Sequence, residues 1–216
     1  MEKTIKAIAN EMDSLASTIF LNMIPEYKEG YLNYVFQTDK EDIQKRRIKN
    51  LAKNFRRLEG NPYFYVMPMS QHSALDIIEN WKFQKPFNLY NVADNLKLEE
   101  QIKNEDQREG KYFQVIRNGA LFGWTSLEKN KNHVKVKLQM KTSEMGKGLG
   151  KDFIKTIEDF VVSEFDVLEL FVSIFSFDEK AIHLFKDLGY TEKSTTEKII
   201  SGKSYHLVEM KKAIES

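Results

Sequence analysis

Residues 145–151 combine glycines and lysines at a spacing that suits a bound phosphate group. They directly precede a segment whose apolar side chains recur at helical spacing, and they read Met145, Gly146, Lys147, Gly148, Leu149, Gly150 and Lys151. Glycines let the backbone approach a ligand and turn its N–H groups outward, and a helix N-terminus adds partial positive charge. A Walker loop does not fit, because it needs Ser or Thr after Gly-Lys, and a dinucleotide motif does not fit, because its third glycine comes one residue early. The stretch therefore predicts a phosphate or pyrophosphate site, with a plain glycine turn as the alternative.

A second stretch, residues 178–190, predicts a helix that Asp178 caps, that ends at Gly189 and that leads into a strand. Together the two stretches resemble the GNAT superfamily of acyl-CoA-dependent N-acyltransferases. The signature loop of that superfamily is R/Q-x-x-G-x-G/A, and a later helix reads N-x-x-A-I-x-L-Y-x-x-x-G-F. The order of elements agrees as well, over roughly residues 61–212. The resemblance implies an enzyme, an N-acetyltransferase that takes acetyl-CoA as its acyl donor.

The resemblance also implies which residues bind each part of acetyl-CoA. The central strand would end at Met140, Lys141 and Thr142 and splay from its neighbour, so that the pantetheine arm hydrogen-bonds along the open edge as a strand would. Its cofactor-binding residues would be Leu138, Gln139 and Met140. Backbone N–H groups of residues 145–151 would hold the pyrophosphate, and a backbone N–H near residues 138–140 would polarise the thioester carbonyl and stabilise the oxyanion. On the later helix, the cofactor side would include Asp178, Ala181 and Phe185.

Three positions depart from the family pattern. Met145 replaces the usual Arg or Gln, and Asp178 replaces Asn but can still cap its helix. Phe185 lies where many members place the Tyr that protonates the departing thiolate, and Phe cannot donate a proton. We take Tyr190 as the candidate acid. The alternatives are Tyr205 or Ser176, a thiolate that leaves unassisted, or a domain that binds CoA and catalyses poorly.

The acceptor amine must lose its proton before it attacks, so a base or a chain of water is needed. Glu169 is the candidate base if it faces the cleft, and His133 and His206 are alternatives that are more typical of surface positions. Lys135 and Lys137 occupy the central strand where some family members carry Glu, and neither is an attractive base.

An acceptor pocket is expected to be lined by aromatic side chains. The candidates are Trp81, Phe83, Tyr90 and Trp124, with core packing as the alternative for each. No pair of histidines has the spacing of metal ligands, so we expect no metal.

The elements that must position these residues form two regions. Residues 1–60 predict an α-helical N-terminal extension of about three helices, the third beginning at Thr38 or Asp39 and stopping at Gly60. Residues 61–216 predict the acetyltransferase domain, an α/β fold with a mixed, mostly antiparallel central sheet flanked by helices. Asn118-Gly119 and Ser201-Gly202 predict hairpin turns in it.

Composition excludes several classes of protein. The formal net charge is +1 and Cys is absent, so no global field recruits nucleic acid or an anionic membrane, and no Cys nucleophile exists. The sequence contains no run of 18 apolar residues, so we expect no membrane span. We therefore expect a cytoplasmic protein whose partners are acetyl-CoA and an amine, small or peptidic, with a homodimer as an open possibility.

Two other functions compete with the enzyme. The domain would be an acyl-CoA sensor if the thiolate has no proton donor and the extension relays occupancy to a partner. The third predicted helix carries seven basic residues between positions 45 and 57, which could bind nucleic acid. This is the least favoured interpretation, because a charged helix face is usually exposed to solvent.

Overall fold

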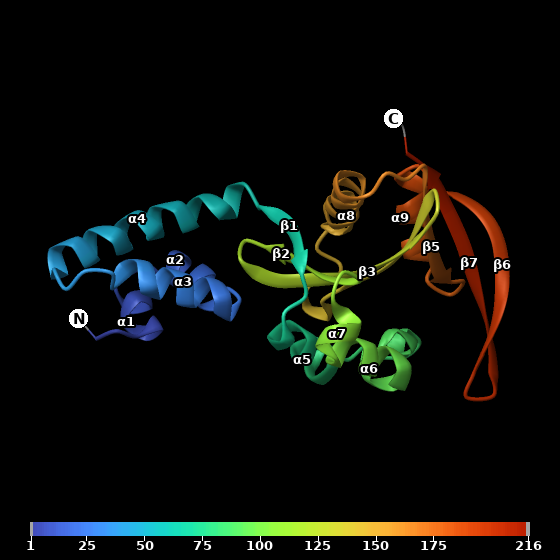
Figure 1. Ribbon diagram of the computed structural model, residues 1–216, viewed down its shortest axis with the longest axis horizontal. Helices are drawn as coiled ribbons and strands as arrows, with labels where there is room; N and C mark the ends of the chain where they lie inside the picture. Colours follow the sequence, from blue (N-terminus) through green and yellow to red (C-terminus); the bar gives the residue numbers. More distant parts are fainter. Residues whose placement is uncertain (1, 215–216) are drawn as a thin grey trace. The chain divides into compact units, whose positions relative to one another are not determined.

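The computed structural model describes residues 2–214, which divide into two compact units (Figure 1). The helical unit contains the chain up to Phe64 together with Ile116–Leu121. The second unit contains Tyr65–Val115 and the chain from Phe122 onward. The boundary expected between residues 60 and 61 stays a prediction, and nothing in the sequence indicated that residues 116–121 group with the helices.

The helical unit has four helices, one more than the sequence predicted. They are α1 (Ile5–Asn10), α2 (Ser14–Asn22), α3 (Pro25–Val35) and α4 (Glu41–Gly60). The first predicted helix is broken because Asp13 caps a new one, accepting a hydrogen bond from the Ala16 N–H at 3.1 Å. The predicted cap of the last helix was also wrong. Lys40 is the N-cap of α4 without a side-chain hydrogen bond, and Thr38 instead accepts from the Lys40 N–H at 3.3 Å.

Aromatic rings form the centre of the helical unit. The Phe20 and Phe55 rings stack at 5.9 Å, and Tyr31 packs edge-on against Phe55 at 5.1 Å. The hairpin turn at residues 118–119 joins this unit by hydrogen bonds, since the Ile24 N–H donates to the Gly119 carbonyl at 2.7 Å. The Asn118 side chain adds two more hydrogen bonds, since its Oδ1 accepts from the Tyr63 N–H at 2.9 Å and its Nδ2 donates to the Leu58 carbonyl at 3.1 Å. Backbone and side-chain groups together therefore hold the turn in this unit.

The second unit is organised around a seven-stranded sheet in the order β1-β2-β3-β4-β5-β7-β6. The β3–β4, β5–β7 and β6–β7 pairs are antiparallel, and the β4–β5 pair is parallel. This mixed, mostly antiparallel sheet with flanking helices confirms the predicted fold class. Its strands are β1 (Phe64–Pro68), β2 (Tyr112–Arg117), β3 (Ala120–Asn130), β4 (His133–Met140), β5 (Glu169–Phe175), β6 (Thr191–Ile200) and β7 (Lys203–Ala213).

Helices cover the two faces of this sheet. Figure 1 shows α5–α7 on one side and α8 on the other. Asp178 caps α9, as the sequence predicted, and Ser70 caps α5. The helical segments of the unit are α5 (Gln71–Asn80), η1 (Phe87–Tyr90), η2 (Val92–Asp94), α6 (Leu96–Lys103), α7 (Glu105–Arg108), η3 (Thr142–Glu144), α8 (Gly150–Glu164) and α9 (Glu179–Asp187).

At Gly123, helix α8 packs closely against the sheet. A Cβ atom at this position would lie 2.4 Å from the Phe153 ring of α8 and 2.8 Å from the Gln139 carbonyl oxygen of β4. Both contacts are far shorter than van der Waals separation, and one of them is to backbone that cannot rotate away. Glycine at this position therefore sets how closely α8, and the loop before it, can lie against the end of β4.

We expect Gly123→Ala to destabilise the second unit by about 1–3 kcal/mol, the usual cost of overpacking a core. Both tryptophans, Trp81 and Trp124, belong to this unit, so urea unfolding followed by tryptophan fluorescence measures the effect. Gly30→Ala is the control, because a Cβ at Gly30 meets nothing within 4 Å. An unchanged midpoint for Gly123→Ala would contradict the close packing of α8.

Candidate active site

The central strands β4 and β5 separate after only three residue pairs. They pair at His133↔Glu169, Val134↔Leu170 and Lys135↔Phe171, whereas on its other side β4 stays paired with β3 as far as Met140↔Gly123. The edge of β4 that faces β5 therefore has no strand partner over residues 136–140. Its backbone groups are free to bond an extended ligand in the way a further strand would. This is the splayed central strand that the sequence predicted.

The glycine loop, residues 145–151, lies at the end of this open edge. Gly146 and Gly148 have φ angles of +76° and +77°, a backbone conformation that residues with a Cβ rarely adopt. No side chain caps α8, and none of the described residues accepts a hydrogen bond from the N–H groups of residues 146–152. A run of unpaired N–H groups at a helix start is an anion-binding arrangement.

The two lysines of the loop are already paired with carboxylates. Lys147 Nζ lies 3.1 Å from Glu144 Oε1, and Lys151 Nζ lies 3.1 Å from Asp187 Oδ2. Such exposed pairs contribute little, about 0–1 kcal/mol, so a bound anion can compete for the lysines. The attraction of the loop for phosphate therefore comes chiefly from its backbone.

A chain of hydrogen bonds joins four elements beside the open edge. Trp124 Nε1 of β3 donates to Gln139 Oε1 of β4 at 2.6 Å, and Gln139 Nε2 donates to the Tyr90 carbonyl at 2.8 Å. The Tyr90 hydroxyl donates to Asp178 Oδ2 at 3.2 Å, while Asp178 Oδ1 accepts from the Ala181 N–H at 3.2 Å. The structure thus brings predicted donor-side and acceptor-side residues together. The side chain of Gln139 was missed by sequence reasoning, which had assigned only its backbone a role.

The four aromatic residues proposed for the acceptor differ in accessibility. Trp81, Phe83 and Trp124 are buried, and the Trp81 indole N–H donates to Asp76 at 3.0 Å. Tyr90 is only half-buried, and its ring packs edge-on against Phe175 at 5.3 Å. Burial raises the pKa of Tyr90, and the nearby Asp178 carboxylate raises this pKa further. Of the four, Tyr90 is the residue whose side chain a ligand can reach without opening the core.

The candidate acid Tyr190 lies inside the core. Its ring packs edge-on against Phe185 at 4.9 Å and under Lys212, whose Nζ is 5.6 Å from the ring centroid. Burial raises the pKa of Tyr190, and so does the Glu158 carboxylate that its hydroxyl faces. A phenol that is buried, close to a carboxylate and turned toward α8 is poorly placed to protonate a thiolate between β4 and β5.

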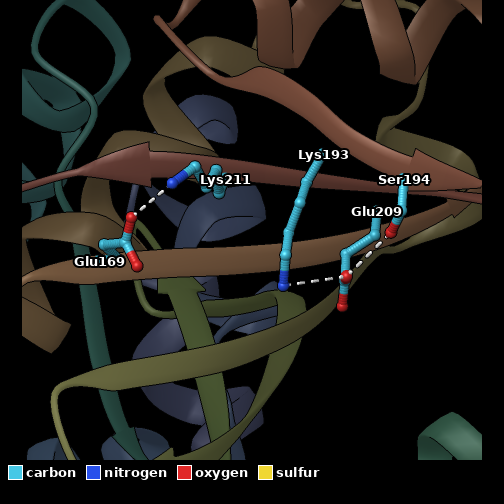
Figure 2. A network of polar contacts seen from close by, with 5 residues as sticks. All are labelled: Glu169, Lys193, Ser194, Glu209 and Lys211. Atoms are coloured by element: carbon cyan, nitrogen blue, oxygen red, sulfur yellow. Dashed lines mark hydrogen bonds and ion pairs between the residues drawn. The ribbon is translucent and has the colours of Figure 1, made fainter.

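The candidate base Glu169 lies at the wrong end of the strands. It pairs with His133 at the start of β4, whereas the glycine loop follows Met140 at the end of that strand, roughly 23 Å away at ~3.3 Å per residue. Its Oε1 accepts a hydrogen bond from Lys211 at 2.7 Å (Figure 2). That bond lowers the pKa of Glu169, which weakens it as a base. Sequence alternation could not show this, because the sheet register decides which end of β4 Glu169 meets.

The structure also holds a cavity in the helical unit. Its volume is about 460 Å³, and three tyrosines and two asparagines of α3 and α4 dominate its wall; the lining residues are Tyr27, Gly30, Tyr31, Tyr34, Asn50, Leu51 and Asn54. None of these residues belongs to the glycine loop or to the open edge of β4, so the cavity is not a part of the candidate active site.

Comparison with known proteins identifies the class to which this site belongs. Residues 75–207, more than half of the chain, match the family model described as an acetyltransferase (GNAT) domain. The chain belongs to this family and is an acyl-CoA-dependent N-acetyltransferase. A comparison with curated proteins finds no match.

Solved structures with the same fold have low sequence identity to the chain. An acetyltransferase of the GNAT family from Bacillus anthracis is 11% identical, with a TM-score of 0.57 over 69% of this chain and 94% of the other. A spermidine N-acetyltransferase from Vibrio cholerae, solved with CoA and spermine, is 15% identical, with a TM-score of 0.56 over 69% of this chain and 95% of the other. At such identities the likeness shows the fold and does not identify the acceptor amine.

Over residues 2–214, no three or more His, Asp or Glu side chains gather in a way that would hold a metal ion. Within the same residues, no helix combines the length and the apolar character needed to cross a membrane.

We expect Tyr190→Phe to leave kcat unchanged, because the hydroxyl faces Glu158 and not the open edge of β4. A general acid contributes about 10²–10⁴-fold, so its loss would be obvious in the rate of thioester consumption with an accepted amine. The same variant should lose about 1 kcal/mol of stability with its buried polar contact. If turnover instead falls by about two orders of magnitude while the fold stays intact, Tyr190 is the acid after all.

Proposed function

We propose that this protein transfers the acetyl group of acetyl-CoA directly to a primary amine of a small molecule or peptide. The observation that carries the proposal is the open edge of β4 over residues 136–140, which ends at a glycine loop with unpaired N–H groups. An edge and an anion site in succession suit a long ligand that has an amide-containing arm at one end and a pyrophosphate at the other.

The residues of this site fit the pyrophosphate and the pantetheine arm of acetyl-CoA. The N–H groups of residues 146–152 would bond the pyrophosphate oxygens, with Lys147 and Lys151 adding charge once they leave their carboxylate partners. The edge at Leu138, Gln139 and Met140 would bond the pantetheine amides. Helix α9, which carries Ala181 and Phe185 after its cap Asp178, lies beside the glycine loop, since a Cβ atom at Gly150 would lie 2.7 Å from the Leu184 side chain of α9.

When bound, acetyl-CoA supplies an activated acetyl group as a thioester. An N–H group of the open edge would orient its carbonyl and stabilise negative charge on the carbonyl oxygen. Phe185 cannot donate a proton, so we propose that CoA departs without a protein acid, which its thiol pKa of ~8.5 makes tolerable. The amine proton would pass to water, because Glu169 lies at the far end of β4. A cytoplasmic location and a homodimer remain predictions.

Thermal unfolding with and without acetyl-CoA tests the donor site. A ligand that binds only the folded state stabilises it by about 2.7 kcal/mol at 100 times its Kd, so the wild-type midpoint should rise. We expect Gly148→Glu to lose this rise, because the substitution forces a side chain with a negative charge into a left-handed loop position.

Gly189→Glu is the matched control for that variant. Gly189 also has a positive φ, +89°, and open space around it, so the same substitution imposes similar backbone strain outside the loop. The control should be destabilised and yet keep the rise with acetyl-CoA. The donor site would be refuted by a wild type that acetyl-CoA does not stabilise, or by equal rises in wild type and Gly148→Glu.

A further inference from the structure

One face of the sheet beside the open edge carries an excess of lysines. Residues 133, 135, 137 and 139 alternate along β4 and share a face, so Lys135 and Lys137 lie on the same side as Gln139. The register places Lys135 beside Phe171 of β5 and Lys137 opposite Ser126 of β3. Lys137 is therefore two residues from Gln139, whose side chain holds Tyr90.

The carboxylates farther along this face already have partners (Figure 2). Glu169 accepts a hydrogen bond from Lys211 at 2.7 Å. Glu209 Oε2 lies 3.6 Å from Lys193 Nζ and accepts a hydrogen bond from Ser194 at 3.2 Å. These contacts neutralise the outer part of the face, over β7 and the start of β6.

Three lysines nearer the open edge have no such partner. Over the chain that the structure describes, neither Lys135 nor Lys137 of β4 nor Lys198 of β6 forms an ion pair. Lys137 is reachable by solvent but closely surrounded by protein atoms, and this burial lowers its pKa. The charges of Lys198 and Lys135 lower this pKa further, while the Glu128 carboxylate opposes them. The three lysines and the Glu128 carboxylate together leave an excess of two positive charges around Lys137.

Such a group of lysines is stabilised by an anion and destabilised by a further cation. Lys137 and Gln139 are about 7 Å apart along the strand, at ~3.3 Å per residue. An anionic group at Lys137 would thus lie within one small molecule's length of the edge at residues 138–140, where the acetyl group is proposed to be held. The distance suits an amine at one end of a short acceptor and an anionic group at the other.

We propose that Lys137, Lys198 and Lys135 bind the anionic end of the acceptor, which is a small primary amine that carries a carboxylate or a phosphate. This inference rests on the proposed acetyl transfer. In the reaction, a bond forms between the amine nitrogen and the acetyl carbon as the C–S bond breaks. The neutral amine gives one proton to water, and CoA departs as a thiolate that takes up one proton from water, so charge and atoms balance. Polyamines, which would bring a second positive charge to Lys137, are disfavoured.

Two matched pairs of amines test the proposal on the whole protein. O-phosphoethanolamine with ethanolamine tests a phosphate, β-alanine with β-alaninamide tests a carboxylate, and spermidine tests a polycation. We expect each anionic amine to have a higher kcat/KM than its uncharged partner and than spermidine. The larger of the two ratios identifies whether phosphate or carboxylate is preferred.

Substitutions of the lysines then show whether these side chains cause the preference for anionic amines. We expect Lys137→Gln and Lys198→Gln to lower kcat/KM for the anionic amine by roughly tenfold to 100-fold, the value of one or two hydrogen bonds to charged groups. The uncharged partner should change less than about twofold, and Lys137→Glu should shift preference toward spermidine. Lys203→Gln, an exposed lysine of β7 without an ion pair among residues 2–214, is the control and should leave the ratios unchanged.

The outcomes separate this inference from the function on which it rests. Failure of acetyl-CoA to stabilise the protein would overturn the proposed function itself. Stabilisation by acetyl-CoA together with equal rates for anionic and uncharged amines, or with ratios that Lys137→Gln leaves unchanged, would overturn the anion site alone. A protein that acetyl-CoA stabilises but that consumes none of the five amines would also overturn this assignment of the acceptor.

Discussion

Beyond Lys135, strand β4 can bond to only one neighbouring strand, and the rest of the acetyltransferase unit follows from this constraint. A strand edge without a partner leaves backbone donors and acceptors that must be satisfied by water or by a ligand. Strand β5 leaves β4 after Phe171 and yet stays paired with β7 as far as Phe175↔Leu207. No residue of β4 has a positive φ, so the opening requires no left-handed backbone within that strand.

Side chains hold the separated strands at their positions. The Phe175 ring at the end of β5 packs against Tyr90 at 5.3 Å and Phe177 at 5.3 Å, while Gln139 of β4 bonds the Tyr90 carbonyl. Tyr90 is therefore in contact with both strands beyond their last pair, Lys135↔Phe171. Because Gln139 is buried, each of its hydrogen bonds would be costly to lose, which fixes η1 relative to β4.

Local signals in the sequence predicted most of the fold. Asp178, Ser70 and the Asn118-Gly119 turn act over three or four residues, and each does in the structure what its type suggested. Gly123 carried a signal that was available and unused, since a glycine within a strand often marks a close approach of another element. The break between α1 and α2 was missed because apolar spacing continues across Asp13.

The structure argues against the roles predicted for Glu169 and Tyr190, and the reason is a different one. Each residue type suits its assigned chemistry, and each lies in or directly before a strand that the sequence predicted. What decides their use is the non-local register that places Glu169 beside His133, and the packing that turns Tyr190 toward Glu158. Neither can be derived from spacing along one segment, whereas a backbone site such as the glycine loop can, because its geometry is encoded by adjacent residues.

The unit has two positive regions, and they are built by different means. At the glycine loop both lysines are paired with carboxylates, so backbone N–H groups provide the attraction and require glycines. On the sheet face Lys137 and Lys198 have no ion pair within residues 2–214, so side-chain charge provides the attraction. A site made of backbone groups binds the same phosphate group whichever amine is the acceptor. Charged side chains on a sheet face, in contrast, can be replaced without altering the fold. With the proposed acceptor site on the sheet face, such a division lets the donor site stay constant while a few substitutions on β4 and β6 change the preferred amine.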